Sequence, residues 1–244
     1  MAALAYVPPA DHVGQSFIAE TRFFTDCVTD AQAYLFIETA DLMVVAIRGT
    51  NSFVDVLHDL DTCPAPYKNE ARYEGAVVHG GLLKQHLAVH ALIGPLIHKF
   101  LHENERGHVC YVGHSAGGAL AAFGALDTSS TFPHRVRYIG FGCPRFSNDA
   151  FRKVFHAHVD EAVMVKNGRD PITKVPPVYV NVCNLQCYGP LDPYPDFPCL
   201  LDMREHDIKE YVRAVSGDAM ARTKNWWERI VCAIIQFTLD RLRQ

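Results

Sequence analysis

Residues 111–126, YVGHSAGGALAAFGAL, decide the fold that this sequence predicts. An apolar run ends at Gly113, Ser115 follows two positions later, and small apolar residues then continue in a pattern that favours a helix. Gly113 and Gly117 flank Ser115 at positions −2 and +2, the spacing of a nucleophile elbow, which is a sharp turn between a strand and a helix. Such a turn brings backbone segments very close together and needs small residues there. A plain glycine-rich turn is the alternative interpretation, and this stretch alone does not exclude it.

The rest of the chain predicts a single α/β domain over residues 1–244. Strands are expected at 31–39, 41–50, 108–115, 135–144 and 161–167, and helices at 14–28, 81–104, 116–126 and 147–158. Alternating strands and helices are typical of a mainly parallel sheet covered by helices on both faces. Pro95 is expected to kink or divide the helix at 81–104. Residues 184–200 are rich in proline and lack periodicity, so we expect them at the rim of an active site.

Composition and net charge limit the classes of function that fit this chain. The chain has 244 residues, of which 49% are hydrophobic and 20% charged, so it can bury a sizeable core. A net charge of −4 and the lack of a Lys/Arg-rich stripe argue against nucleic acid as a partner. The first residues lack a basic region and contain Pro8 and Pro9, so we expect no secretory signal. We therefore expect a cytoplasmic location without a transmembrane segment. The eight cysteines are expected to be free thiols.

Ser115 is a candidate nucleophile only if a base and an orienting carboxylate reach it. In α/β hydrolases the chain order is serine, then Asp or Glu, then histidine. His206 is the only histidine after residue 160. Asp170 follows the strand predicted at 161–167, at its carboxyl end, where ligands of parallel sheets collect. We therefore predict a Ser115–Asp170–His206 triad, with a second-choice set of aspartates at Asp192, Asp196 and Asp202.

An acyl-transfer site also needs two N–H donors for the oxyanion of the tetrahedral intermediate. Ala116, directly after the serine, is expected to supply one donor. Thr50, after the strand predicted at 41–50, is preferred for the second. Gly80 and Gly81 compete for this role but fit close packing at a helix entrance better.

The histidines and cysteines are the candidate metal ligands of the sequence. His86/His90 and His98/His102 are i,i+4 pairs on the helix predicted at 81–104. The sequence shows no HExxH pattern and no third ligand for either pair, so a histidine-rich helix is the preferred interpretation. Cys183, Cys187 and Cys199 lack CxxC spacing. No metal and no organic cofactor is therefore expected.

Several separated motifs together resemble the fungal-type (class three) triacylglycerol lipases. They are VVAIRGT, SFVDVLHDLD, VVHGGLL, GHSAGG, FGCPRFSN and NGRDPITKVPP, followed by the late His206, all in family order between about residues 30 and 210. The resemblance implies an α/β-hydrolase fold and a carboxylic ester hydrolase acting on lipid esters. It assigns Ser115 as nucleophile, Asp170 as orienting acid and His206 as base, with Thr50 and Ala116 as the oxyanion donors.

The resemblance also implies a lid after the RGT motif, here residues 51–75, although a helix packed permanently on the core fits its amphipathic pattern equally well. The C-terminal segment 224–243 has a wide apolar arc and is too charged to span a bilayer. It predicts a docked helix, with an interfacial membrane helix as the alternative. The expected partners are a lipid or small ester substrate and a transient contact with a membrane or lipid droplet surface. Two other functions stay open, an acyltransferase and a catalytically silent lipid- or partner-binding protein.

Overall fold

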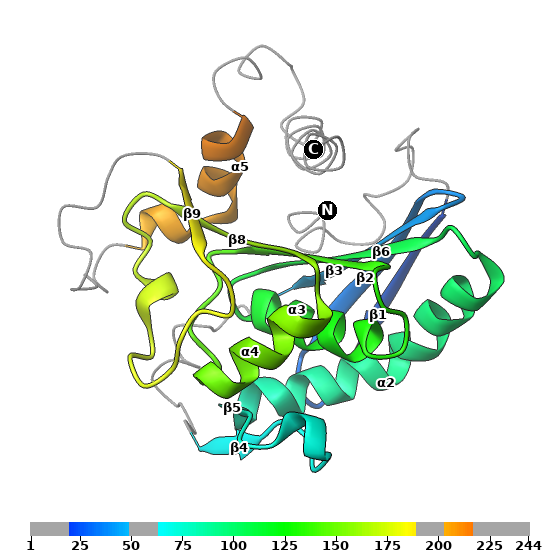
Figure 1. The fold of residues 1–244 in the computed structure, drawn as a ribbon. Helices are drawn as coiled ribbons and strands as arrows, with labels where there is room; N and C mark the ends of the chain where they lie inside the picture. Colours follow the sequence, from blue (N-terminus) through cyan, green and yellow to red (C-terminus); the bar gives the residue numbers. More distant parts are fainter. Residues whose placement is uncertain (1–19, 49–62, 189–202, 217–244) are drawn as a thin grey trace.

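The fold is built on a seven-stranded sheet (Figure 1). The structure is a computed structural model that describes residues 20–48, 63–188 and 203–216. In the order β1-β2-β3-β6-β7-β8-β9, the strands are β1 (Glu20–Thr25), β2 (Gln32–Thr39), β3 (Leu42–Arg48), β6 (His108–His114), β7 (Val136–Phe141), β8 (Glu161–Asn167) and β9 (Leu185–Tyr188). The first three pair antiparallel, and every pairing from β3 to β9 is parallel. The predicted mainly parallel sheet is confirmed.

Helices cover both faces of the sheet. In Figure 1, α2 (Gly80–Glu103), α3 (Ala116–Ser129) and α4 (Asp149–His158) lie below the sheet, and α5 (Ile208–Ser216) lies above its β8–β9 side. The central strands are apolar on both faces because both are buried. Neighbouring residues of β3 show this, since Val45 belongs to the core cluster under α2 and α3 and Val44 to the cluster that includes Tyr211 of α5.

A second, small sheet joins β4 (Pro64–Pro66) to β5 (Val77–His79). The turn between them contains a 3₁₀ turn at Ala71–Tyr73, and the rings of Tyr67 and Tyr73 are buried there in edge-to-face contact. These residues belong to the second half of the predicted lid, so residues 63–75 pack against the body of the protein. The amphipathic part of that lid, up to residue 62, lies outside the described residues, and its role as a cover stays a prediction.

Three sequence-based expectations need correction. Residues 20–25 of the helix predicted at 14–28 form β1, because ETRFFT pairs along its whole length with β2. Four residues of the irregular segment predicted at 184–200 form β9, which extends the sheet beyond β8. The helix α2 continues through Pro95 without a break. Pro95 and Ala91, whose carbonyl loses its partner, are both exposed, while Ile93 and Ile97 anchor the opposite face in the core.

Within the described residues, no helix is long and apolar enough to cross a membrane. The cytoplasmic location stays a prediction. The C-terminal segment 224–243 lies outside the described residues, so the choice between a docked and an interfacial helix is also open.

Candidate active site

Ser115 sits in a strained turn between β6 and α3. Its backbone has φ 58° and ψ −133°, a conformation that is rare for residues other than glycine. A side chain on Gly113 would place its Cβ 2.1 Å from the carbonyl oxygen of Gly117, so the turn closes only with glycine at that position. Strain of this kind costs about 1–3 kcal/mol and persists where the surrounding structure enforces it. The GHSAG stretch therefore forms a sharp elbow, not a loose glycine-rich turn.

The elbow brings Ser115 to a histidine from the other end of the chain. Nε2 of His206 lies 3.0 Å from Oγ of Ser115, and Nδ1 of His206 lies 2.9 Å from Oδ2 of Asp170. An ionised carboxylate only accepts hydrogen bonds, so Nδ1 of a neutral His206 donates to Asp170. Its Nε2 then carries the lone pair that accepts from the Ser115 hydroxyl. The three side chains that the sequence predicted together thus form one hydrogen-bonded chain.

Asp170 is fully buried, and its carboxylate is saturated with donors. Oδ1 accepts the backbone N–H of Ile172 at 2.9 Å, and Oδ2 accepts the Tyr211 hydroxyl as well as His206. Burying a carboxylate is costly unless such donors compensate for lost hydration. The loop 168–176 after β8 therefore presents Asp170 as a fixed acceptor.

His206 is held from its backbone as well as from its ring. It ends a short 3₁₀ turn, Arg204–His206, that precedes α5. Nδ2 of Asn167, the last residue of β8, donates to the carbonyl of Glu205 at 3.0 Å, and the Glu205 carboxylate accepts the backbone N–H of Arg169. The loop that carries Asp170 thus also fixes the turn that carries His206.

Gly142 forms the wall behind this pair. It directly follows β7 with φ +55°, and a Cβ built on it would lie 2.8 Å from Oδ2 of Asp170 and 3.1 Å from Nδ1 of His206. A side chain at this position would therefore occupy the space of the acid–imidazole contact. The sequence offered a signal in the FGCP motif, but it did not show which atoms the glycine makes room for.

Two further buried groups surround the imidazole. Nε2 of His114 lies 2.8 Å from the backbone oxygen of His206, and the two rings lie 4.7 Å apart. Burial, followed by the nearby His206 ring, holds the pKa of His114 well below its usual value of 6.5. His114 is therefore a neutral packed neighbour of His206.

Tyr211 of α5 is the other group, and sequence reasoning missed it. Burial, followed by the charge of Asp170 and its hydrogen bond, raises the pKa of the Tyr211 phenol well above 10. Its hydroxyl thus stays protonated as a donor to Asp170. Its position in the amphipathic pattern of α5 was a signal only for burial, since the contact partner lies 41 residues earlier.

The structure describes one of the two expected oxyanion donors, Ala116. Ala116 is the first residue of α3 and is buried beside Ser115, and the first N–H groups of a helix have no intrahelical acceptor. Thr50 lies outside the described residues, as do Asp192, Asp196 and Asp202. The N–H of Gly80 donates to the carbonyl of Cys63 at 3.1 Å, which supports the interpretation of that glycine as close packing at a helix entrance.

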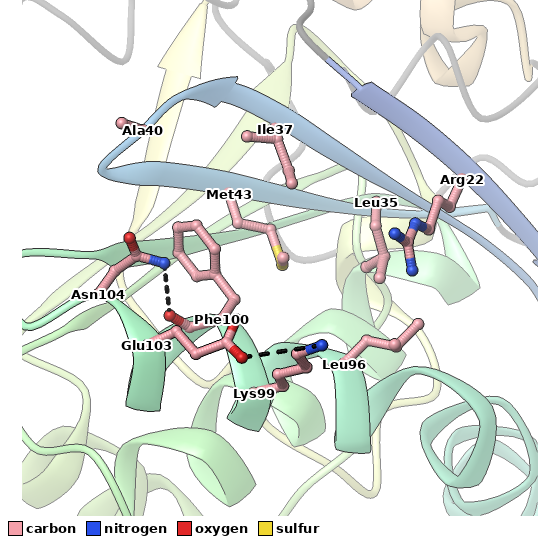
Figure 2. A pocket seen from close by; sticks show the side chains of 10 residues that line it. All are labelled: Arg22, Leu35, Ile37, Ala40, Met43, Leu96, Lys99, Phe100, Glu103 and Asn104. Atoms are coloured by element: carbon pink, nitrogen blue, oxygen red, sulfur yellow. Dashed lines mark hydrogen bonds and ion pairs between the residues drawn. The ribbon is translucent and has the colours of Figure 1, made fainter.

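A pocket of about 330 Å³ lies elsewhere, between the first strands of the sheet and the C-terminal half of α2 (Figure 2). Leu35, Met43 and Phe100 point into it, and the ion pair of Lys99 with Glu103, at 3.7 Å, lies at its edge. None of the residues that line it belongs to the Ser115 site. It is therefore separate from the ester-binding region expected at Ser115.

The chain matches a known protein family over most of the segment that carries this site. Residues 44–180 match the family described as lipase (class 3), which is more than half of the 244 residues. The chain belongs to the class 3 lipase family. The matched residues include Ser115 and Asp170, and they end before His206, so the family match does not extend to the third member of the hydrogen-bonded chain.

Individual curated proteins are also similar to this chain. Phospholipase A(1) DAD1, chloroplastic, of Arabidopsis thaliana is 30% identical over 153 residues, 56% of this chain and 34% of that protein. The secreted mono- and diacylglycerol lipase LIP4 of Malassezia restricta is 28% identical over 145 residues, 55% of this chain and 47% of that protein. The chain thus spans about a third to a half of these curated relatives.

The solved structures confirm the predicted α/β-hydrolase fold. The lipase from Rhizopus microsporus var. chinensis superposes with a TM-score of 0.63 at 25% identity, covering 72% of this chain and 66% of that one. The class 3 lipases are therefore this chain's relatives in both sequence and fold.

Proposed function

We propose that the chain is a serine-dependent carboxylic ester hydrolase that acts on lipid esters through an acyl-enzyme on Ser115. The observation that carries the proposal is the continuous hydrogen-bonded chain from Ser115 through His206 to Asp170. Membership of the class 3 lipase family supports the same conclusion.

The proposed reaction starts at the Ser115 hydroxyl. Its Oγ attacks the carbonyl carbon of the ester while its proton passes to Nε2 of His206. Asp170 holds the imidazole in the required tautomer and stabilises the imidazolium that forms. The negative oxygen of the tetrahedral intermediate accepts from the N–H of Ala116 and, as a second proposed donor, from Thr50.

The intermediate then collapses. His206 gives its proton to the leaving alcohol, the C–O bond breaks, and an acyl–Ser115 ester remains. Water attacks this ester with His206 again as the base, which releases the fatty acid and restores the serine. No step requires a metal or an organic cofactor.

The substrate class follows from the relatives. Phospholipase A(1) and mono- and diacylglycerol lipase are the activities that their names print, so the proposed substrates are phospholipids and acylglycerols. A transient contact with a membrane or lipid droplet surface is part of the proposal, because such substrates reside there.

The test uses a fluorophosphonate label and a substrate panel. Ser115→Ala should abolish labelling and lower kcat by about a millionfold. Ser147→Ala is the matched control, since Ser147 is also fully buried and, within the described part of the chain, its hydroxyl has no hydrogen-bond partner. It should keep both signals. A folded wild-type protein that fails to label would refute the proposal in favour of a silent lipid-binding protein.

The panel should contain short-chain esters, acylglycerols and phospholipids, with and without a competing alcohol. Release of free acid in proportion to the alcohol product supports hydrolysis. Transfer of the acyl group to the competing alcohol in preference to water would show an acyltransferase instead.

A further inference from the structure

A cluster of metal-ligating side chains lies between α2 and α3, outside the ester site. His86 and His90 occupy neighbouring turns on one face of α2, and Asp127 of α3 faces them. One ligand atom from each residue lies within 4.8 Å of the other two. The sequence showed no third ligand for the histidine pair, because Asp127 lies 37 residues beyond His90 and only the packing of the two helices brings it there.

The three side chains already contact one another. Nε2 of His86 lies 2.8 Å from Oδ2 of Asp127, and the rings of His86 and His90 lie 4.9 Å apart. The other oxygen of Asp127, Oδ1, accepts the Tyr67 hydroxyl at 2.7 Å and the Lys68 ammonium at 2.5 Å. Oδ2 of Asp127 therefore faces His86, while Oδ1 contacts Tyr67 and the partly exposed Lys68.

One nitrogen atom in this cluster has no role in the proposed ester hydrolysis. Among the described residues, Nδ1 of His90 is buried without a hydrogen-bond partner, and its lone pair is available to an ion. Buried polar atoms are nearly always paired, and each exception calls for a cause such as an ion. A histidine with an unused, buried lone pair beside a carboxylate is such an exception.

The backbone also makes room for the His90 ring. A Cβ on Gly94 would lie 3.0 Å from Nε2 of His90. Glycine in a helix interior costs roughly 0.5–1 kcal/mol relative to alanine. Gly94 thus leaves room for the imidazole ring of His90 against the helix.

We propose that His86, His90 and Asp127 form a binding site for Zn²⁺, with water as the fourth ligand. Two imidazoles and one carboxylate are a ligand set that zinc accepts in tetrahedral geometry. Zn²⁺ takes the lone pair of Nε2 of His86, whose proton moves to Nδ1, and takes the place of the hydrogen bond to Oδ2 of Asp127. Mg²⁺ and Ca²⁺ prefer oxygen ligands and are excluded from this set.

The position of the site defines its role. Asp127 lies twelve residues after Ser115, about 18 Å along the helix at 1.5 Å per residue, so the metal is too distant to touch the ester. It joins α2 to α3, and Asp127 also contacts Tyr67 and Lys68 in the segment that follows β4. Zinc here stabilises the folded protein.

Lys68 gives the proposal a second, independent consequence. Its ammonium shares the Asp127 carboxylate with the proposed metal, and two cations on one carboxylate repel each other. Lys68 is partly exposed and its side chain is long, so it can move aside at a cost. Lys68→Gln should therefore bind Zn²⁺ more tightly than the wild type does.

The test is calorimetric titration of the chelator-treated full chain with Zn²⁺ in the presence of a thiol reductant. We expect one site in the wild type, a rise in Tm of roughly 5 °C at a hundredfold excess over Kd, and no response to Mg²⁺. His90→Ala should weaken binding at least about 100-fold, since loss of an outer-shell partner alone costs 10–100-fold. Lys68→Gln should lower Kd several-fold.

The matched control is the double variant His98→Ala/His102→Ala. This pair has the same i,i+4 spacing on the same helix, and its rings contact Phe132 instead of a carboxylate. The control should bind Zn²⁺ as the wild type does. If His90→Ala fails to fold by circular dichroism, His90→Gln serves in its place.

Three results would overturn the site: no zinc binding by the wild type, unchanged binding by the His90 variant, or weakening by the His98/His102 control. Exposed thiols at Cys27, Cys63 and Cys187 are the competing source of zinc binding. Co²⁺ separates the two, since a thiolate-to-cobalt charge-transfer band would place the metal on cysteine and refute the proposal. None of these readouts depends on ester hydrolysis.

Discussion

Replacing Gly142 with alanine tests the geometry of the acid–imidazole pair without removing any functional group. Gly142 has φ +55°, where a residue with a side chain costs about 1–2 kcal/mol. The new Cβ would lie 2.8 Å from Oδ2 of Asp170, so that oxygen must retreat by about 0.6 Å to reach ordinary contact at 3.4 Å. Asp170 is fully buried and its other oxygen is bound to the N–H of Ile172, so the displacement passes to His206.

The expected loss follows from that displacement. Misplacing a reacting group by 1 Å costs about a hundredfold, so kcat/KM should fall by about 10- to 100-fold. Loss of the orienting acid in a serine protease, about 10⁴-fold, sets an upper bound. The assay is hydrolysis of a water-soluble short-chain ester, because such a substrate does not depend on a lipid surface.

Gly75→Ala is the matched control. Gly75 also has positive φ, at +72°, but among the described residues its added Cβ would meet Cβ of Ala150 alone, at 3.8 Å. Both variants should lose about 2–4 °C in Tm for each 1 kcal/mol of backbone strain, and only Gly142→Ala should lose activity. The reasoning is wrong if the two variants agree in kcat/KM within threefold.

Three further predictions concern groups around the site and in the core. Tyr211→Phe removes a hydrogen-bond donor to the Asp170 carboxylate. The free energy of unfolding, measured in urea, should fall by about 1–3 kcal/mol. The kcat should fall less than tenfold, because His206 and the backbone N–H of Ile172 still hold Asp170. An unchanged free energy of unfolding would contradict that contact. His114 stays neutral in the folded protein, whereas in the unfolded chain it binds a proton below its usual pKa of 6.5. The stability that a neutral His114 provides is therefore present above pH 6.5 and is lost as the pH falls. Between pH 6.5 and 5, the free energy of unfolding of the wild type should fall by about 1.4 kcal/mol per pH unit more than that of His114→Asn. Equal slopes would argue that His114 is not depressed. Burial raises the pKa of Cys110 and Cys183 to about 12 and that of Cys143 further. Iodoacetamide at pH 8 should therefore modify the exposed Cys27, Cys63 and Cys187 and spare the three buried cysteines, as measured by mass spectrometry. Labelling of all six at equal rates would show that the core opens.

The interior elements were predictable because their patterns are local. Continuous apolar runs predicted β3, β6, β7 and β8, and the helix predicted at 147–158 is α4, which Asn148 caps by accepting the N–H of Phe151. The edge strands of the sheet were harder to predict from the sequence. Within the described sheet, β1 and β9 each pair with one neighbour, and their short sequences show no pattern that separates a strand from a helix or loop.

The sequence alone determined the chain order of Ser115, Asp170 and His206, because a sharp elbow needs glycines at fixed spacing and a single late histidine leaves little choice. Their roles in catalysis remain a proposal that the variants above test. Sequence could not reveal Tyr211 and Gly142 as neighbours of Asp170, nor Asp127 as a neighbour of His86 and His90. Those contacts join residues far apart in the chain, so they exist only after helices and sheet pack. Local patterns encode which residues turn or are buried, whereas tertiary packing alone decides which buried groups meet.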